Sequence, residues 1–228
     1  MAEGHAPLAL VAGAGAGLGQ ALCRRFRDGG MTVVGLGRTR PDAVAGGFHT
    51  LDLADPAEAL PCIAELIDRH GPPEIVVHNT AELVTGPFAE TSYDDYRRSW
   101  ASIVGTLVLL AQATLQPMAR GGGGTLIVSG ATASLRGGAR FSAFASAKFA
   151  LRGLTQSLAR EFQPEGIHVA HVILDGIIDT ARSRARHGLA PERMMDPDAI
   201  AETYWQIAHQ PPSAWTHELD LRPASETF

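Results

Sequence analysis

The sequence predicts a single-domain, doubly wound α/β protein whose parallel β-sheet is flanked by helices on both faces. Two observations carry this prediction: apolar runs of strand length alternate with amphipathic stretches of helix length, and the runs are continuously apolar. Strands joined through helices lie parallel, and right-handed crossovers place those helices on both faces of the sheet. The 228 residues suit one domain spanning 1–228, because no repeat, low-complexity segment or linker interrupts them.

The first half of the chain is expected to contain four strands and two helices. The strand Leu8–Ala12 enters a glycine-rich turn, and the helix Leu18–Asp28 that follows ends at a pair of glycines, which favour helix termination. The helix Pro56–His70 ends where a Gly-Pro-Pro sequence breaks it. The other apolar strands expected in this half are Met31–Leu36, Phe48–Leu51 and Glu74–His78.

The second half is expected to contain three helices and three strands. Four consecutive glycines, Gly121–Gly124, separate the first of these helices from the strand that follows. The segment Ala181–Met195 is polar and rich in arginine, and it lies between a strand end and the next helix, so we expect a mobile loop there. The expected helices are about Ser92–Met118, Phe141–Phe162 and Ala199–His209, and the expected strands are Thr125–Ser129, Ile167–Leu174 and Trp215–Leu221.

Composition and charge exclude several classes of function. A formal net charge of −5 and scattered basic residues argue against a nucleic-acid surface. Cys23 and Cys62 have neither metal-ligand spacing nor a disulfide framework, so no metal site is expected. Met1–Pro7 lacks the features of a signal peptide, and the longest apolar run, Ile103–Ala111, is too short to span a membrane. We therefore expect a cytoplasmic protein with no membrane or nucleic-acid partner.

The turn after the first strand carries the clearest binding motif. Gly13, Gly17 and Gly19 let the backbone approach a pyrophosphate, and the helix that follows directs free amides toward it. Glycine spacing alone is a weak signal, but here it follows a strand and opens a helix, as the motif requires. The turn residues expected to contact a dinucleotide are Gly13, Gly15, Ala16, Gly17, Leu18 and Gly19.

This Gly-x-x-x-Gly-x-Gly turn resembles that of the short-chain dehydrogenases/reductases, and the resemblance runs from about Leu8 to Leu221. It implies a Rossmann-type fold that binds a nicotinamide dinucleotide. His78-Asn79-Thr80-Ala81 stands where the family has Asn-Asn-Ala-Gly. The stretch from Asp175 to Thr180 resembles Pro-Gly-x-x-x-Thr, with Asp175 in place of the proline. The resemblance implies further cofactor contacts from Asp52, Leu53, Asn79, Lys148, Gly176, Ile178 and Thr180.

The end of the second strand favours NADP(H) over NAD(H). An acidic residue there would bind the ribose hydroxyls of NAD and repel a 2′-phosphate, but none occurs before Asp42. Arg38, with Thr39 or Arg40, is instead placed to hold the phosphate through charge-assisted hydrogen bonds. In the alternative interpretation, Arg38 stacks on the adenine and serves either cofactor.

The resemblance also shows that the tyrosine of the family's catalytic pair is replaced. In the family, a tyrosine four residues before a lysine shares one helix face with it and exchanges a proton with the substrate. Here Phe144 occupies the tyrosine position before Lys148. A shift in alignment cannot restore the pair, because no tyrosine lies between Tyr96 and Tyr204.

Two further positions of the catalytic set also differ. Ala131 falls at the position of the family's serine, and Thr132 beside it is a partial substitute. Ser102 falls at the position of its asparagine. Asp175 ends a central strand at the ligand-binding crevice, so it is a candidate acid or base, with a purely structural carboxylate as the alternative. The candidate catalytic residues are Lys148, Asp175, Thr132 and Ser102, with His78 and Ser129 as weaker ones.

These residues predict an NADP(H)-dependent oxidoreductase that acts on a small carbonyl, alcohol or imine-like compound. Two alternatives remain open: a protein that holds the cofactor without turnover, and a non-redox enzyme that uses the same crevice. The helices expected at Ser92–Met118 and Phe141–Phe162 are rich in small and apolar residues, and in the family they pack against their copies. We therefore also expect a homodimer or homotetramer.

Overall fold

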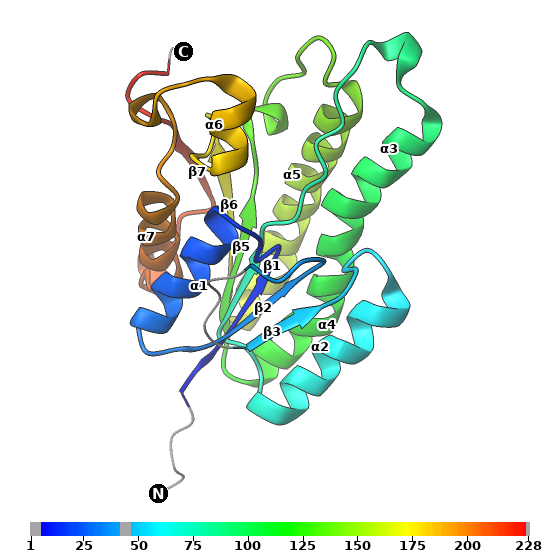
Figure 1. Cartoon of the computed structure of the whole chain (residues 1–228). Helices are drawn as coiled ribbons and strands as arrows, with labels where there is room; N and C mark the ends of the chain where they lie inside the picture. Colours follow the sequence, from blue (N-terminus) through cyan, green and yellow to red (C-terminus); the bar gives the residue numbers. More distant parts are fainter. Residues whose placement is uncertain (1–5, 42–46, 227–228) are drawn as a thin grey trace, which may run out of the picture.

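The computed structural model describes residues 6–41 and 47–226 and contains one seven-stranded parallel sheet (Figure 1). Asp42 and most of the segment Met1–Pro7 lie outside the described residues. The strand order is β3-β2-β1-β4-β5-β6-β7, which confirms the doubly wound arrangement. The strands are β1 (Leu8–Ala12), β2 (Thr32–Gly37), β3 (Gly47–Thr50), β4 (Ile75–His78), β5 (Gly124–Ser129), β6 (Ile167–Leu174) and β7 (Glu218–Leu221).

Helices cover both faces of the sheet (Figure 1). One face packs against α2 (Pro56–His70), α4 (Thr106–Arg120) and α5 (Ser142–Phe162), with Leu66, Leu110 and Leu151 in that half of the core. The other face packs against α1 (Leu18–Asp28) and α7 (Pro197–Ala208). Strands β1, β4 and β5 are buried on both faces, which explains why their sequences are continuously apolar.

The helix expected at Ser92–Met118 is divided by a π-helical turn. α3 (Tyr93–Trp100) continues through the π turn Ala101–Gly105 into α4. The combined stretch from Tyr93 to Arg120 is long and apolar enough in composition to cross a membrane, but half of its most apolar window is buried inside the protein. The apolar side of α4 forms part of the core, as expected for a helix that covers a sheet.

The carboxyl ends of the strands meet at one edge, where open α/β sheets bind ligands. The strand order reverses between β1 and β4, so the glycine-rich turn after β1 lies at this switch point. Part of the segment expected to be a mobile loop is helical, α6 (Ala181–His187), and the sequence did not predict that helix. Short 3-10 turns occur at Phe88–Glu90, Thr132–Ser134, Gln163–Glu165, Pro191–Arg193 and Pro212–Ala214.

Candidate functional site

Two neighbouring cavities open along the carboxyl edge of the sheet. The first, of about 920 Å³, extends from the glycine turn past α5 to α6. The second, of about 580 Å³, shares the glycine turn and extends to the ends of β2 and β3. Together they match the two halves of a dinucleotide that crosses the switch point.

The cavities bring together most of the residues that the sequence predicts for cofactor binding. Those lining the first cavity are Gly13, Gly15, Ala16, Leu18, Gly19, Arg38, Asn79, Lys148, Gly176, Ile178 and Thr180. Those lining the second are Gly13, Gly15, Arg38, Thr39, Asp52, Leu53 and Asn79. Gly17 lines neither cavity; it lies under Thr180, whose Cγ2 would be 2.6 Å from a Cβ at residue 17.

Of the four glycines in the turn, only Gly15 has room for a side chain. A Cβ at Gly13 would lie 2.5 Å from the carbonyl oxygen of Asn79, and a Cβ at Gly19 would lie 2.3 Å from the carbonyl oxygen of Gly13. At Gly15 no atom lies within 4 Å of the Cβ position, so this residue faces open space in the cavity. The tight contacts build the turn, and the open position leaves a place where a phosphate can approach the backbone.

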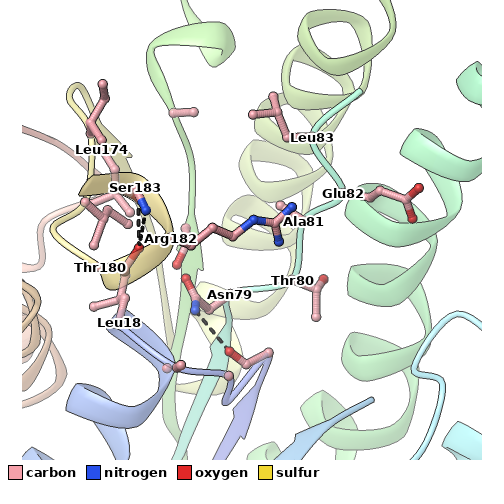
Figure 2. A pocket seen from close by; sticks show the side chains of 18 of the residues that line it. Leu18, Asn79, Thr80, Ala81, Glu82, Leu83, Leu174, Thr180, Arg182 and Ser183 are labelled. Carbon is pink, nitrogen blue, oxygen red and sulfur yellow. Dashed lines mark hydrogen bonds between the residues drawn. The ribbon is translucent and has the colours of Figure 1, made fainter. Parts of the chain in front are cut away.

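Asn79 fastens the turn to β4. Its side-chain Nδ2 donates to the carbonyl oxygen of Gly13 at 3.2 Å (Figure 2), and its backbone amide donates to Ala12. Asn79 matches the asparagine that the family has here, and its two hydrogen bonds hold the phosphate turn against the neighbouring strand.

Lys148 lies buried at the inner end of the first cavity. Its Nζ donates to the carbonyl oxygen of Ser129 at 2.8 Å and lies 5.8 Å from the centre of the Phe144 ring. Burial lowers the pKa of Lys148 to about 8. An ammonium group has three protons, so one hydrogen bond to Ser129 leaves others for a ligand.

The protein's three tyrosines lie away from this point. Tyr93 is exposed on α3, the Tyr96 hydroxyl donates to Ser142, and Tyr204 is buried in α7 within hydrogen-bond distance of the Ser129 hydroxyl. Within residues 6–41 and 47–226, no tyrosine lines either cavity. Ala131 and Phe144 do line the first cavity, so the inner end presents a methyl group and a phenyl ring.

His78 belongs to a buried polar cluster that the sequence did not predict. The hydroxyls of Thr80 and Thr106 both donate to the carbonyl oxygen of Ser102 in the π turn, and the His78 Nε2 lies 2.8 Å from each hydroxyl oxygen. The two threonine hydroxyl oxygens also lie 2.6 Å from each other, so the three side chains form one hydrogen-bonded cluster. Burial lowers the pKa of His78 to about 3, so the ring is neutral near pH 7. Ser102 itself lines the second cavity.

Asp175 and Thr132 do not line either cavity in the described part of the chain. The Asp175 carboxylate accepts a hydrogen bond from the Thr132 hydroxyl and lies 3.2 Å from Arg222 and 4.0 Å from Arg136. Only 5 % of Asp175 is exposed. This geometry is that of a structural carboxylate, but these partners are side chains from the end of β7 and the loop after β5, whereas the sequence suggested backbone amides of the following turn.

Arg38 is paired only loosely in the structure. Its Nη1 lies 3.9 Å from the Glu82 carboxylate, and the other oxygen of that carboxylate lies 3.5 Å from Arg98. The Arg38 side chain is 66 % exposed at the junction of the two cavities. A partly exposed pair at this distance is weak, so Arg38 can move to a ligand phosphate at little cost.

The first cavity also has basic residues that sequence reasoning did not nominate. Arg182, Arg186 and His187 of α6 line it. The arginines at alternate positions from 182 to 186 were the available signal, but sequence spacing alone does not show which of them face a cavity. Among the residues that the structure describes, no group of three or more His, Cys, Asp or Glu could hold a metal ion.

Comparison with known proteins defines the family. A family model described as short chain dehydrogenase matches residues 7–188. A sorbitol dehydrogenase from Cereibacter sphaeroides is 32% identical over 180 residues, covering 75% of this chain and 70% of the relative, and an L-xylulose reductase from Bos taurus is 30% identical over 71% and 68%. The crystal structure of a short-chain dehydrogenase from Rhodopseudomonas palustris superposes with a TM-score of 0.81 at 34% identity, covering 96% of this chain and 99% of that one. The chain belongs to the short-chain dehydrogenase family.

Proposed function

We propose that the protein is an NADP(H)-dependent oxidoreductase that acts on a small carbonyl, alcohol or imine-like compound, with Lys148 as its proton donor and acceptor. The observation that carries this proposal is the buried Lys148 ammonium beside Phe144, at the inner end of a cavity that begins at a phosphate-binding turn. The named relatives, a sorbitol dehydrogenase and a xylulose reductase, support oxidation or reduction at a hydroxyl or carbonyl carbon.

The residues present fit a nicotinamide dinucleotide. Gly15 leaves open space where a Cβ would stand, which suits close approach of the pyrophosphate to the backbone. Thr39, Asp52 and Leu53 would enclose the adenosine half in the second cavity, with Arg38 at the 2′-phosphate. Gly176, Ile178 and Thr180 would hold the nicotinamide half in the first. When bound, the reduced cofactor supplies a hydride to the carbonyl carbon.

Lys148 would supply the matching proton. Its Nζ holds one hydrogen bond to Ser129 and has protons left to donate to the carbonyl oxygen, after which the neutral amine regains a proton from water. A pKa of about 8 lies near working pH, where general acid catalysis is most effective. Ala131 and Phe144 offer no proton, and the Ser129 hydroxyl, which also lines the cavity, lies 2.9 Å from the Tyr204 hydroxyl, so we assign the donor role to Lys148.

A homodimer or homotetramer in the cytoplasm completes the proposal. Trp100 of α3 and Phe149 of α5 are about half exposed, and pairing of these helices with their copies would cover them. Static light scattering at micromolar concentration tests this part: a mass of two or four chains is expected, and a monomer contradicts it.

The activity is tested with NADPH and a panel of small ketones, aldehydes and cyclic imines, after calorimetry has shown that NADPH binds. We expect at least one compound to be reduced, with equal amounts of NADPH consumed and alcohol or amine formed. The changes at Phe144 and Ala131 favour a second candidate, a protein that binds the cofactor without turnover. NADPH binding with no product from any compound supports that candidate and rejects the reductase.

A further inference from the structure

The outer wall of the first cavity is basic. Arg182 and Arg186 are four residues apart on α6, so they share one face of the helix, and both line the cavity together with His187. Figure 2 shows the Arg182 side chain reaching from α6 toward Ala81 on the opposite wall. Both arginines are exposed residues that also line the cavity.

Arg182 and Arg186 make no ion pair with the part of the chain that the structure describes. Arg184, between them in sequence, makes a bidentate ion pair with Asp179, at 2.5 and 2.7 Å. For Arg182 and Arg186, no carboxylate of the described residues lies within 4.0 Å. Glu82 is the one acidic side chain among the described residues that line this cavity, and it already faces Arg38 and Arg98. The outer wall thus has cationic groups without an internal counter-ion.

The arginines lie at different places along the path of a dinucleotide. Arg182 lines both cavities, so it lies where a bound dinucleotide passes from one to the other, beside its pyrophosphate. Arg186 and His187 line only the first cavity. That cavity also contains Lys148 at its inner end, where the substrate carbonyl is expected. Arg186 and His187 thus share a cavity with Lys148 and lie outside the second cavity, so a 2′-phosphate bound in the second cavity does not account for them.

We propose that the substrate carries a carboxylate or phosphate group and that Arg186 and His187 bind it. The proposal rests on the reductase function above and names its substrate class: small oxo acids or phosphorylated carbonyl compounds. A guanidinium group binds planar anions through two parallel hydrogen bonds, and an imidazole N–H adds a third donor. A charge-assisted contact of this kind changes affinity by about 10–100-fold.

The experiment uses matched pairs of ketones that differ in charge. The NADPH-saturated protein is titrated with 4-oxopentanoate and its methyl ester, and with dihydroxyacetone phosphate and dihydroxyacetone, and the fluorescence of bound NADPH is followed. We expect at least one anion to bind about tenfold or more tightly than its neutral partner. The pair that shows this preference distinguishes a carboxylate from a phosphate substrate. Equal affinities within both pairs, or no saturable binding of either anion, overturn the proposal.

Two variants of the same helix assign the effect to a residue. Arg186→Gln should abolish the preference for the anion while leaving NADPH affinity unchanged. Arg184→Gln removes the same charge from the same helix outside the cavity, and it should keep the preference. Arg182→Gln should instead weaken NADPH itself. A preference that survives Arg186→Gln rejects the proposed site. Absence of NADPH binding in calorimetry rejects the proposed function and this inference together, whereas NADPH binding without charge discrimination rejects this inference alone.

Discussion

The two ends of the first cavity differ in how closely they keep the family's pattern. At the glycine turn, Gly13 and Gly19 are packed so tightly against backbone atoms that a methyl group does not fit, and Asn79 fixes the turn to β4. At the inner end, the sequence comparison predicts that Phe144 and Ala131 take the positions of the family's tyrosine and serine. Steric constraint thus accounts for the glycines of the turn, whereas the proton chemistry that we propose for the inner end depends on Lys148.

This difference indicates which substitutions each end of the first cavity tolerates. The turn is constrained by backbone contacts, so nearly any side chain at its tight positions disturbs the fold. At the inner end, by contrast, Phe144 and Ala131 line the cavity, and their side chains have no proton to donate. Lys148 is subject to both steric and chemical constraints, because it is buried in the fold and also lines the cavity.

The largest expected effect contrasts two glycines of the same turn. Gly19→Ala should lower the free energy of unfolding by more than about 3 kcal/mol, because its Cβ would overlap the backbone of Gly13 and Ala14. Gly15→Ala should melt like the parent, since no atom lies within 4 Å of its Cβ position, yet bind NADPH about tenfold or more weakly. Thermal melting and calorimetry measure both. A fully stable Gly19→Ala variant would contradict the claim that backbone contacts leave no room for a methyl group at this position.

Asp175→Asn tests whether this buried carboxylate is structural. Loss of the buried carboxylate beside Arg222 and Thr132 should lower the free energy of unfolding by about 1–3 kcal/mol. Asp220→Asn is the control, because Asp220 also pairs with Arg222 but is more exposed, and it should cost less than about 1 kcal/mol. Denaturant titration measures both variants. A catalytic loss above about 100-fold in a stable Asp175→Asn variant with parental NADPH affinity would return this residue to a role in proton transfer.

Arg38→Ala tests the cofactor end. NADPH affinity should fall about tenfold while NADH affinity changes little, because only the 2′-phosphate loses a charged partner. Arg40→Ala is the matched control, since Arg40 follows the same strand but lines neither cavity among the described residues. Calorimetric titration of the parent and both variants with NADPH and with NADH measures these affinities. If the preference for NADPH is absent in the parent or survives in Arg38→Ala, the end of β2 does not select the cofactor.

Phe144→Tyr gives the smallest expected effect. Restoring the phenol should raise carbonyl reduction by less than about tenfold, because Ala131 still cannot polarise the carbonyl and Ser102 still replaces the asparagine. Initial rates with NADPH and a simple ketone measure the gain, after melting shows that the variant is folded. A thousandfold gain would show that the inner end is the family's ordinary site with one residue missing.

The sequence predicted the fold, and it predicted which residues of the glycine turn and its neighbours share a cavity, for a physical reason. Apolar strands, glycine spacing and strand ends are local patterns, and the structure brings Gly13, Asn79 and Lys148 together as they imply. The surroundings of Asp175 could not be predicted, because Arg222 reaches it from the end of β7. The cavity-facing arginines of α6 were also missed, because a polar segment without an apolar face does not reveal which side it turns inward.

The central claim is that Lys148 handles the proton at the inner end, and the pH dependence of NADPH oxidation tests it most directly. Burial lowers the pKa of Lys148 to about 8, so its ammonium form, the proton donor, is lost as pH rises through that value. For a saturating carbonyl substrate, the account predicts a rate that falls about tenfold per pH unit above about pH 8. In Lys148→Met, the rate should be at least about 100-fold lower and should lack that decline. A parental rate that stays level to pH 10, or a Lys148→Met variant with parental activity and NADPH affinity, would contradict the claim.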